Sequence, residues 1–238
     1  MHVHMPKPLH GWRVFAGEVG IIVIGVLIAL GAEQLVQAAH QRGEGRQANE
    51  VIRGELEYNL ARLRSRLAIR PCVERRIGEL QQLLDTAQLQ TAIKTPTWVG
   101  RPQFWTMQTS RWQAESQAAR GALIDPDALA DYSQMYAWMS NLANEMAVEQ
   151  ADWAKLRTLE HLSQVNASAA YDLNATLQDA RYRNWRISLQ TTQLTDLARS
   201  AGLNEVRNNF PASQSICLPI NTPRAVAVRG SRFPFGEP

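Results

Sequence analysis

Residues 14–39, which read VFAGEVGIIVIGVLIALGAEQLVQAA, decide how this chain is built. Their uninterrupted apolar run covers residues 19–32, between Glu18 and Glu33. That run is shorter than the ~20 apolar residues that a bilayer requires. A helix over residues 17–39, rising ~1.5 Å per residue, would be roughly 34 Å long and would cross a ~30 Å hydrocarbon core if both glutamates lay near the interfaces. The stretch therefore predicts a single transmembrane helix.

Two other interpretations of this stretch are open at the level of sequence. A cleavable signal peptide would use Lys7 and Arg13 as its basic region and residues 36–38 (VQA) as its small-residue cleavage site. A buried core helix of a soluble domain would not need isoleucine, valine and leucine on all of its faces. We expect a retained membrane anchor.

One face of the predicted helix combines small side chains with a carboxylate. At ~100° per residue it contains Glu18, Ile22, Gly25, Ala29 and Ala32. Small residues let helices approach closely, and an intramembrane carboxylate usually faces protein or water. This transmembrane face is therefore a candidate docking surface for another membrane helix. Alternatively, Glu18 lies at the interface and the glycines are ordinary for a membrane helix. A second set of small residues lies elsewhere on the helix: Gly17, Gly20 and Gly31.

The composition bounds the class of protein. The chain has 238 residues, and without the anchor ~200 are left, enough for one domain with a sizeable core. Lysine and arginine total 25 against 22 acidic residues, a net charge of +3, and the two signs are interleaved. A nucleic-acid-binding surface would show a basic block with aromatic residues, so we expect no nucleic-acid partner.

The two cysteines, Cys72 and Cys217, lie far apart in the chain and have no metal-ligand spacing. A single pair after a membrane anchor suggests a disulfide in an oxidising compartment, and the alternative is two unrelated buried thiols. Charges on the two sides of the anchor do not settle its orientation. The disulfide interpretation, together with the anchor, favours a cytoplasmic N-terminus and a main domain on the other side of the membrane.

Helical periodicity continues beyond the anchor. Apolar residues recur at helical spacing over residues 48–93, where Pro71 is expected to kink or end the helix. Residues 42–46 (RGEGR) are either a hinge or a weak place in one continuous helix. A short helix is expected over residues 103–119, with Gly121 as its C-cap residue.

Two later helices have clearer boundaries. Residues 125–127 (DPD) are a strong start signal, because Asp125 can cap, Pro126 suits the first helical position and Asp127 meets the helix dipole. From there a near-heptad apolar seam continues to about residue 161. Another helix is expected to start at residue 166 or 168 and to end at Gly202.

These patterns divide the chain into four parts. Residues 1–13 form a tail, residues 14–39 the transmembrane helix, residues 40–207 an extramembrane helical domain, and residues 208–238 a Pro-rich tail. No alternating runs with turn signals suggest a sheet, although residues 225–228 could form a short extended segment. The expected fold is all-α: one N-terminal transmembrane helix, an antiparallel helical bundle and an irregular C-terminal tail.

No motif in the sequence specifies a reaction. HExxH, GxSxG, GxGxxG and Walker-type patterns are absent, and the histidines have no motif context. Catalytic triads assemble in space, so motifs alone do not exclude them. We expect a protein that is not an enzyme and that uses no cofactor or metal.

The seven tryptophans of the chain include a group in the predicted loop and short helix after residue 94. This group consists of Trp98, Trp105 and Trp112. Tryptophan is frequent in protein cores and is also enriched at interface hot spots. The group is therefore either core packing or an exposed set of interface aromatics.

The anchor also resembles a known type of sequence. Residues 11–33, GWRVFAGEVGIIVIGVLIALGAE, look like the N-terminal anchor of uncharacterised proteobacterial inner-membrane proteins, in which W-x-x-F-x-G-E leads into G-x-L-I-A-L. The resemblance covers about a tenth of the chain. It implies a single-pass inner-membrane protein and carries over no catalytic residue.

These observations favour a function by contact. We expect a non-enzymatic accessory subunit that packs against a larger inner-membrane complex, with membrane lipid and other membrane-protein subunits as partners and no prediction of its oligomeric state. A membrane-anchored periplasmic sensing or ligand-binding domain is the alternative, weakened by an N-terminal tail too short for an output domain. An envelope enzyme is the third hypothesis.

Overall fold

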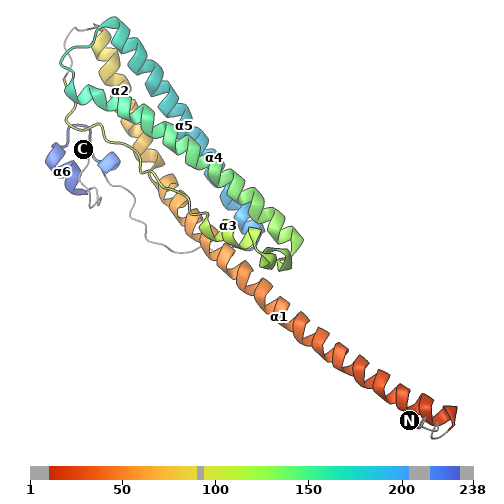
Figure 1. The fold of residues 1–238 in the computed structure, drawn as a ribbon. Coiled ribbons are helices and arrows are strands. Elements are labelled where there is room, and N and C mark those ends of the chain that lie inside the picture. Colours follow the sequence, from red (N-terminus) through yellow and green to blue (C-terminus); the bar gives the residue numbers. More distant parts are fainter. Residues whose placement is uncertain (1–10, 90–93, 204–214, 231–238) are drawn as a thin grey trace, which may run out of the picture.

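A computed structural model describes residues 11–89, 94–203 and 215–230, and every regular element among them is a helix (Figure 1). The all-α prediction is therefore confirmed. Most of the predicted N-terminal tail and much of the C-terminal tail lie outside the described residues. The α-helices are α1 (Trp12–Ala68), α2 (Arg70–Leu89), α3 (Ser110–Gln117), α4 (Pro126–Leu156), α5 (Ala167–Ser200) and α6 (Arg224–Gly230). The 3-10 helices are η1 (Ala119–Leu123), η2 (Arg157–His161) and η3 (Ser215–Cys217).

The long helix α1 contains both the predicted anchor and the first helix of the bundle. It is continuous through residues 42–46, so the hinge interpretation of RGEGR is wrong. The helix ends at Ala68 and is capped by Ile69, and α2 begins at the next residue, Arg70. Pro71 explains this break, because proline has no backbone N–H to donate to the preceding turn. The predicted end of α2 at residue 93 lies outside the described residues.

The bundle consists of α1 with its continuation α2, of α4 and of α5, and side-chain hydrogen bonds give the directions of these helices relative to one another. Tyr132 of α4 bonds Asn49 and Glu149 of α4 bonds Arg66, so α4 runs parallel to α1. Asn174 and Gly202, near the two ends of α5, bond Gln81 and Arg53 respectively, so α5 runs antiparallel to α1 and α2. α5 is therefore antiparallel to both of its neighbours, as predicted for an antiparallel bundle, while α4 and α1 run parallel to each other.

The parallel direction of α4 follows from the segment that precedes it. Residues 94–109 run back along the bundle beside α2 and α1, toward the end where α1 projects (Figure 1). Arg76 bonds the carbonyl of Trp98 near the start of this return segment, and Asn59 bonds Gln108 near its end. A long connection of this kind lets α4 start again at the same end as α1.

The core fills the space between α1, α2, α4 and α5. One cluster, around Leu56, Leu63 and Met139, joins the first half of the bundle, and another, around Leu80 and Trp153, joins the far half; all five are fully buried. These residues belong to the apolar seams that the sequence predicts.

The predicted starts of the two later helices and the end of the second at Gly202 are confirmed, while the first ends at Leu156 and continues as the 3-10 helix η2 to His161. The Asp125 carboxylate accepts hydrogen bonds from the backbone N–H groups of Asp127 and Ala128 at the start of α4. The Asn166 side chain caps α5 in the same way. Gly202 follows α5 with φ of 68°, a left-handed conformation that glycine adopts without strain.

Three local predictions are wrong. The helix expected over residues 103–119 covers only Ser110–Gln117, because the Asn59 side chain pairs with both backbone groups of Gln108 and holds that part extended. Gly121 is not a C-cap but lies inside η1, where a Cβ would be 2.5 Å from the Glu115 carbonyl oxygen. Residues 225–228 are helical, as part of α6.

Candidate functional site

The N-terminal part of α1 is the largest exposed apolar surface among the described residues. Ile21 and Leu35 are 74% and 75% exposed, and no residue in the most apolar stretch of this helix is buried. α1 is the one described helix long and apolar enough to cross a membrane. Figure 1 shows that this part projects well beyond the bundle.

The transmembrane face predicted from sequence lies on this projecting part of α1. Glu18, Ile22, Gly25, Ala29 and Ala32 are all exposed. A Cβ added at Gly25 would meet nothing within 4 Å, and the same holds for Gly17, Gly20 and Gly31 on the other faces. The structure therefore leaves room for close approach on this face without distinguishing it from the rest of the span.

The small-residue face also continues above the predicted membrane segment. Gly43 is 18 residues, or five full turns, beyond Gly25, and Gly54 lies ~20° from the same line. Both glycines are exposed and have open space where a Cβ would lie. Ile52, about half a turn away, is fully buried in the bundle. This side of α1 is thus turned away from the bundle as far as Gly54, whereas Ala61, five turns beyond Gly43 on the same line, is buried.

The tryptophan group does not form an exposed surface. Trp98 is 1% exposed, so its prediction as an interface aromatic is wrong. Trp105 is half-buried and donates its indole N–H to Ser65 at 2.9 Å. Trp112, also half-buried, stacks on Tyr136 with ring centroids 4.9 Å apart. All three pack the return segment and α3 onto the bundle.

The predicted disulfide is present. Cys72 at the start of α2 is bonded to Cys217 of η3, across 145 positions of sequence. The neighbouring backbone is also tied down, because Arg75 donates to the Cys217 carbonyl and Arg76 to the Leu218 carbonyl. The disulfide therefore holds residues 215–230 against the far end of the bundle.

Arg76 connects three parts of the chain at this end. Its buried guanidinium donates to Glu79 on α2, to the carbonyls of Trp98 and Val99 in the return segment, and to Leu218. Burial lowers the pKa of Arg76, and the hydrogen bond and charge of Glu79 oppose that effect. The sequence did not identify this residue as structural.

A second buried charge lies in the middle of the bundle. Arg66 donates to Glu149 at 2.6 Å and to Asn184 at 3.1 Å, so one guanidinium joins α1, α4 and α5. Both charged side chains have no exposed surface. Burial raises the pKa of Glu149, and the charge and hydrogen bond of Arg66 oppose it. The sequence offered one signal for this pair: Arg66 and Glu149 are charged residues at buried positions of the helical pattern, three residues after Leu63 and Met146 respectively.

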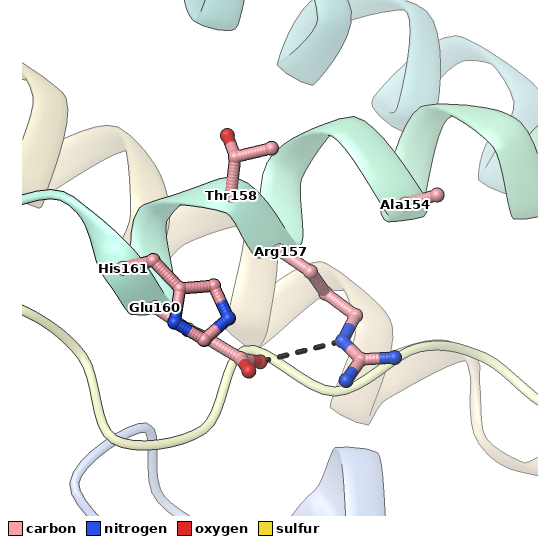
Figure 2. A pocket seen from close by; sticks show the side chains of 5 residues that line it. All are labelled: Ala154, Arg157, Thr158, Glu160 and His161. Carbon is pink, nitrogen blue, oxygen red and sulfur yellow. Dashed lines mark ion pairs between the residues drawn. The ribbon is translucent and has the colours of Figure 1, made fainter. Parts of the chain in front are cut away.

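The hollow shown in Figure 2 lies at η2 and has a volume of about 210 Å³. Its lining includes Arg157, Glu160 and His161, with the guanidinium of Arg157 pointing toward the Glu160 carboxylate at 3.5 Å. Glu160 also accepts a hydrogen bond from the Val99 N–H, and Arg224 of α6 lies 3.8 Å from it. These contacts give Glu160 a role in joining η2, the return segment and α6.

The described side chains offer little for metal chemistry. No group of three histidine, cysteine, aspartate or glutamate side chains in residues 11–89, 94–203 and 215–230 could hold a metal ion. The exposed apolar part of α1 is the most extensive candidate contact surface among the described residues. Comparison with known proteins found no family model, curated protein or solved structure that matches the chain.

Proposed function

We propose that this protein is a non-enzymatic, single-pass membrane subunit that packs against a larger inner-membrane complex. The observation that carries the proposal is the projection of an exposed apolar helix from a bundle that has buried its own core. An exposed apolar surface of this size is stable only in lipid or against another protein.

The transmembrane face supports a protein partner in addition to lipid. Gly25, Ala29 and Ala32 would let another membrane helix approach closely, and packing at small residues is a principal source of affinity between helices in lipid. The exposed Gly43 and Gly54 continue the same side of α1 above the membrane. One partner could therefore contact both the span and the base of the domain.

The orientation that we propose places the N-terminus in the cytoplasm and the bundle in the periplasm. The Cys72–Cys217 disulfide supports this orientation, because disulfides persist in oxidising compartments such as the bacterial periplasm and are rare in the cytosol. A thiol-reactive, membrane-impermeant label on intact cells tests it. A cysteine introduced at the exposed Ser140 should react from outside, and protection until the inner membrane is opened would overturn the orientation.

Affinity purification of the full-length chain from native membranes in mild detergent tests the proposed function. We expect the protein to co-migrate with a larger membrane complex on a native gel, with its partners identified from the same band. Migration as a free chain or as a complex of this chain alone, from membranes that retain intact complexes, would contradict the proposal.

A further inference from the structure

The outward side of α5 carries a second, mostly apolar seam, whose contact with the rest of the bundle includes the hydrogen bond from Gln178 to Gln81 of α2. Its positions recur at alternate spacings of four and three residues, the pattern of a coiled-coil interface. The four largest side chains of the seam are 75%, 54%, 50% and 41% exposed, in chain order. The members of this outer seam are Tyr171, Ala175, Gln178, Tyr182, Trp185, Leu189 and Thr192, and all of them are exposed.

The outer seam lies opposite the face that α5 contributes to the core. Leu177, Ala180 and Leu194 on the inner face are fully buried against the rest of the bundle. On the outer side, the ring centroids of Tyr182 and Trp185 lie 5.7 Å apart, so the two rings form one continuous aromatic surface. A helix that is apolar on two opposite sides needs a covering element on each of them.

Charged residues avoid the outer seam. Five charged side chains occur on α5 between Tyr171 and Thr192, and none of them is at a seam position. They are Asp172, Asp179, Arg181, Arg183 and Arg186. A seam without charges is suited to contact with an identical seam, because in such a contact each charge would face a like charge.

We propose that the outer seam is a self-association surface, on which a second copy of this chain packs its own α5 in parallel. The parallel register rests on the membrane anchoring proposed above. Two copies held in one bilayer by the N-terminal part of α1 stand the same way up and at the same height. Tyr182, Trp185 and Leu189 then each meet their counterpart around a two-fold axis normal to the membrane.

The exposed area is of the right size for such a contact. Aromatic side chains bury 150–250 Å² each when fully covered, so the four largest seam residues leave roughly 450 Å² per copy at their observed exposure. If fully covered, these residues of two copies would bury roughly 900 Å², just below the ~1,000 Å² that is the lower limit for a biological interface. Ala175, Gln178 and Thr192 add to that area.

Self-association through α5 does not compete with the partner proposed for α1. The side of α1 that carries Gly25, Gly43 and Gly54 is turned away from the bundle, whereas the outer seam lies on a different helix. A dimer of this kind would present two transmembrane faces to other subunits. The complex would then contain this chain in pairs.

Cysteine crosslinking of the full-length protein in native membranes tests the inference. Ala175→Cys and Leu189→Cys place thiols on the outer seam, and Ser140→Cys places one at an exposed position of α4 as a matched control. After oxidation of the membranes with copper phenanthroline, we expect a reducible dimer for both seam variants, several-fold stronger than for the control. Adding Trp185→Glu should remove the dimer from Leu189→Cys, because like charges would then face each other.

The outcomes separate this inference from the proposed function. Dimer bands no stronger than the control, or crosslinking of the seam to a different polypeptide, would overturn self-association through α5. The same samples are fractionated into membrane and soluble parts. A chain found in the soluble part would overturn the membrane-anchored function, while its crosslinks would still decide the role of the seam.

Discussion

The two halves of α1 are equally helical but are held in that conformation by different means. Residues 15–39 are rich in isoleucine, valine and glycine, which form helices poorly in water, and nearly all are exposed. Residues 48–68 are rich in leucine, arginine and glutamate, which favour helix, and Ala48, Ile52 and Leu56 are fully buried. In lipid a helix is enforced, because every backbone polar group must bond within the chain. The helical conformation of residues 15–39 therefore depends on their surroundings, and that of residues 48–68 on contacts within the bundle.

The largest effect should come from breaking the buried charge pair that joins the bundle half of α1 (residues 48–68) to α4. Arg66→Met or Glu149→Leu alone leaves an uncompensated charge in the core and should lower the free energy of unfolding by ~3–5 kcal/mol. The double variant should recover most of that loss, because each charge is removed together with its partner. Chemical unfolding in detergent measures both. Additive losses in the double variant would contradict this account of the pair.

Removal of the disulfide should have the next largest effect, and it should leave the helix over residues 15–39 unchanged. Cys72→Ser should lower the free energy of unfolding by ~2–4 kcal/mol, because the long loop that ends at Cys217 is no longer closed. Wild-type protein should also migrate differently on reducing and non-reducing gels, and Cys72→Ser should not. Unchanged stability of the variant would show that the contacts of Arg75 and Arg76 hold the C-terminal segment by themselves.

The boundary between the two halves can be tested with neighbouring glycines. A Cβ at Gly45 would lie 2.6 Å from the Leu123 carbonyl oxygen, whereas one at Gly43 meets nothing within 4 Å. Gly45→Ala should lower the free energy of unfolding by ~1–3 kcal/mol through overpacking. Gly43→Ala should be neutral or stabilising by up to ~1 kcal/mol, since alanine favours helix. Equal effects of the two variants would place the boundary elsewhere.

The smallest effect concerns pH. Burial, together with the hydrogen bond to Glu55, raises the pKa of Tyr136 well above its usual value. The unfolded chain therefore loses this proton first, so stability is full below about pH 10 and falls above it by up to ~1.4 kcal/mol per pH unit. Tyr136→Phe should remove this contribution to the fall of stability with pH, and the control Tyr171→Phe, at an exposed position, should not. Identical slopes in wild type and Tyr136→Phe, measured by chemical unfolding between pH 9 and 11, would exclude this coupling.

The sequence predicted the parts of the fold that follow from local patterns. The long apolar N-terminal helix, the break at Pro71 and the cap at Asp125 depend on residues close in sequence, and the structure contains all three. The parallel direction of α4 relative to α1 was not predicted, because it depends on where residues 94–109 run, which Asn59 and Arg76 determine from distant positions. Neither side chain carries a local signal of that role.

The candidate site was less predictable for the same physical reason. The transmembrane face could be located from helical spacing, but its partner is not in this chain. Trp98 could not be distinguished from an exposed aromatic, because its surroundings come from residues distant in sequence: Arg76 bonds its carbonyl and Ile220 accepts from its backbone N–H. The outer seam of α5 became visible only when the structure showed which of its two apolar faces the bundle uses.

The most direct test of the contact function compares two substitutions in the span. Gly25→Leu alters the small-residue face of α1, and Gly31→Leu makes the same change on a different face, about a third of a turn away. We expect both variants to insert in the membrane and to keep the unfolding temperature of the wild-type bundle. Only Gly25→Leu should lose the membrane partner in affinity purification from native membranes. Retention of the partner by Gly25→Leu, or its loss from both variants alike, would contradict the account.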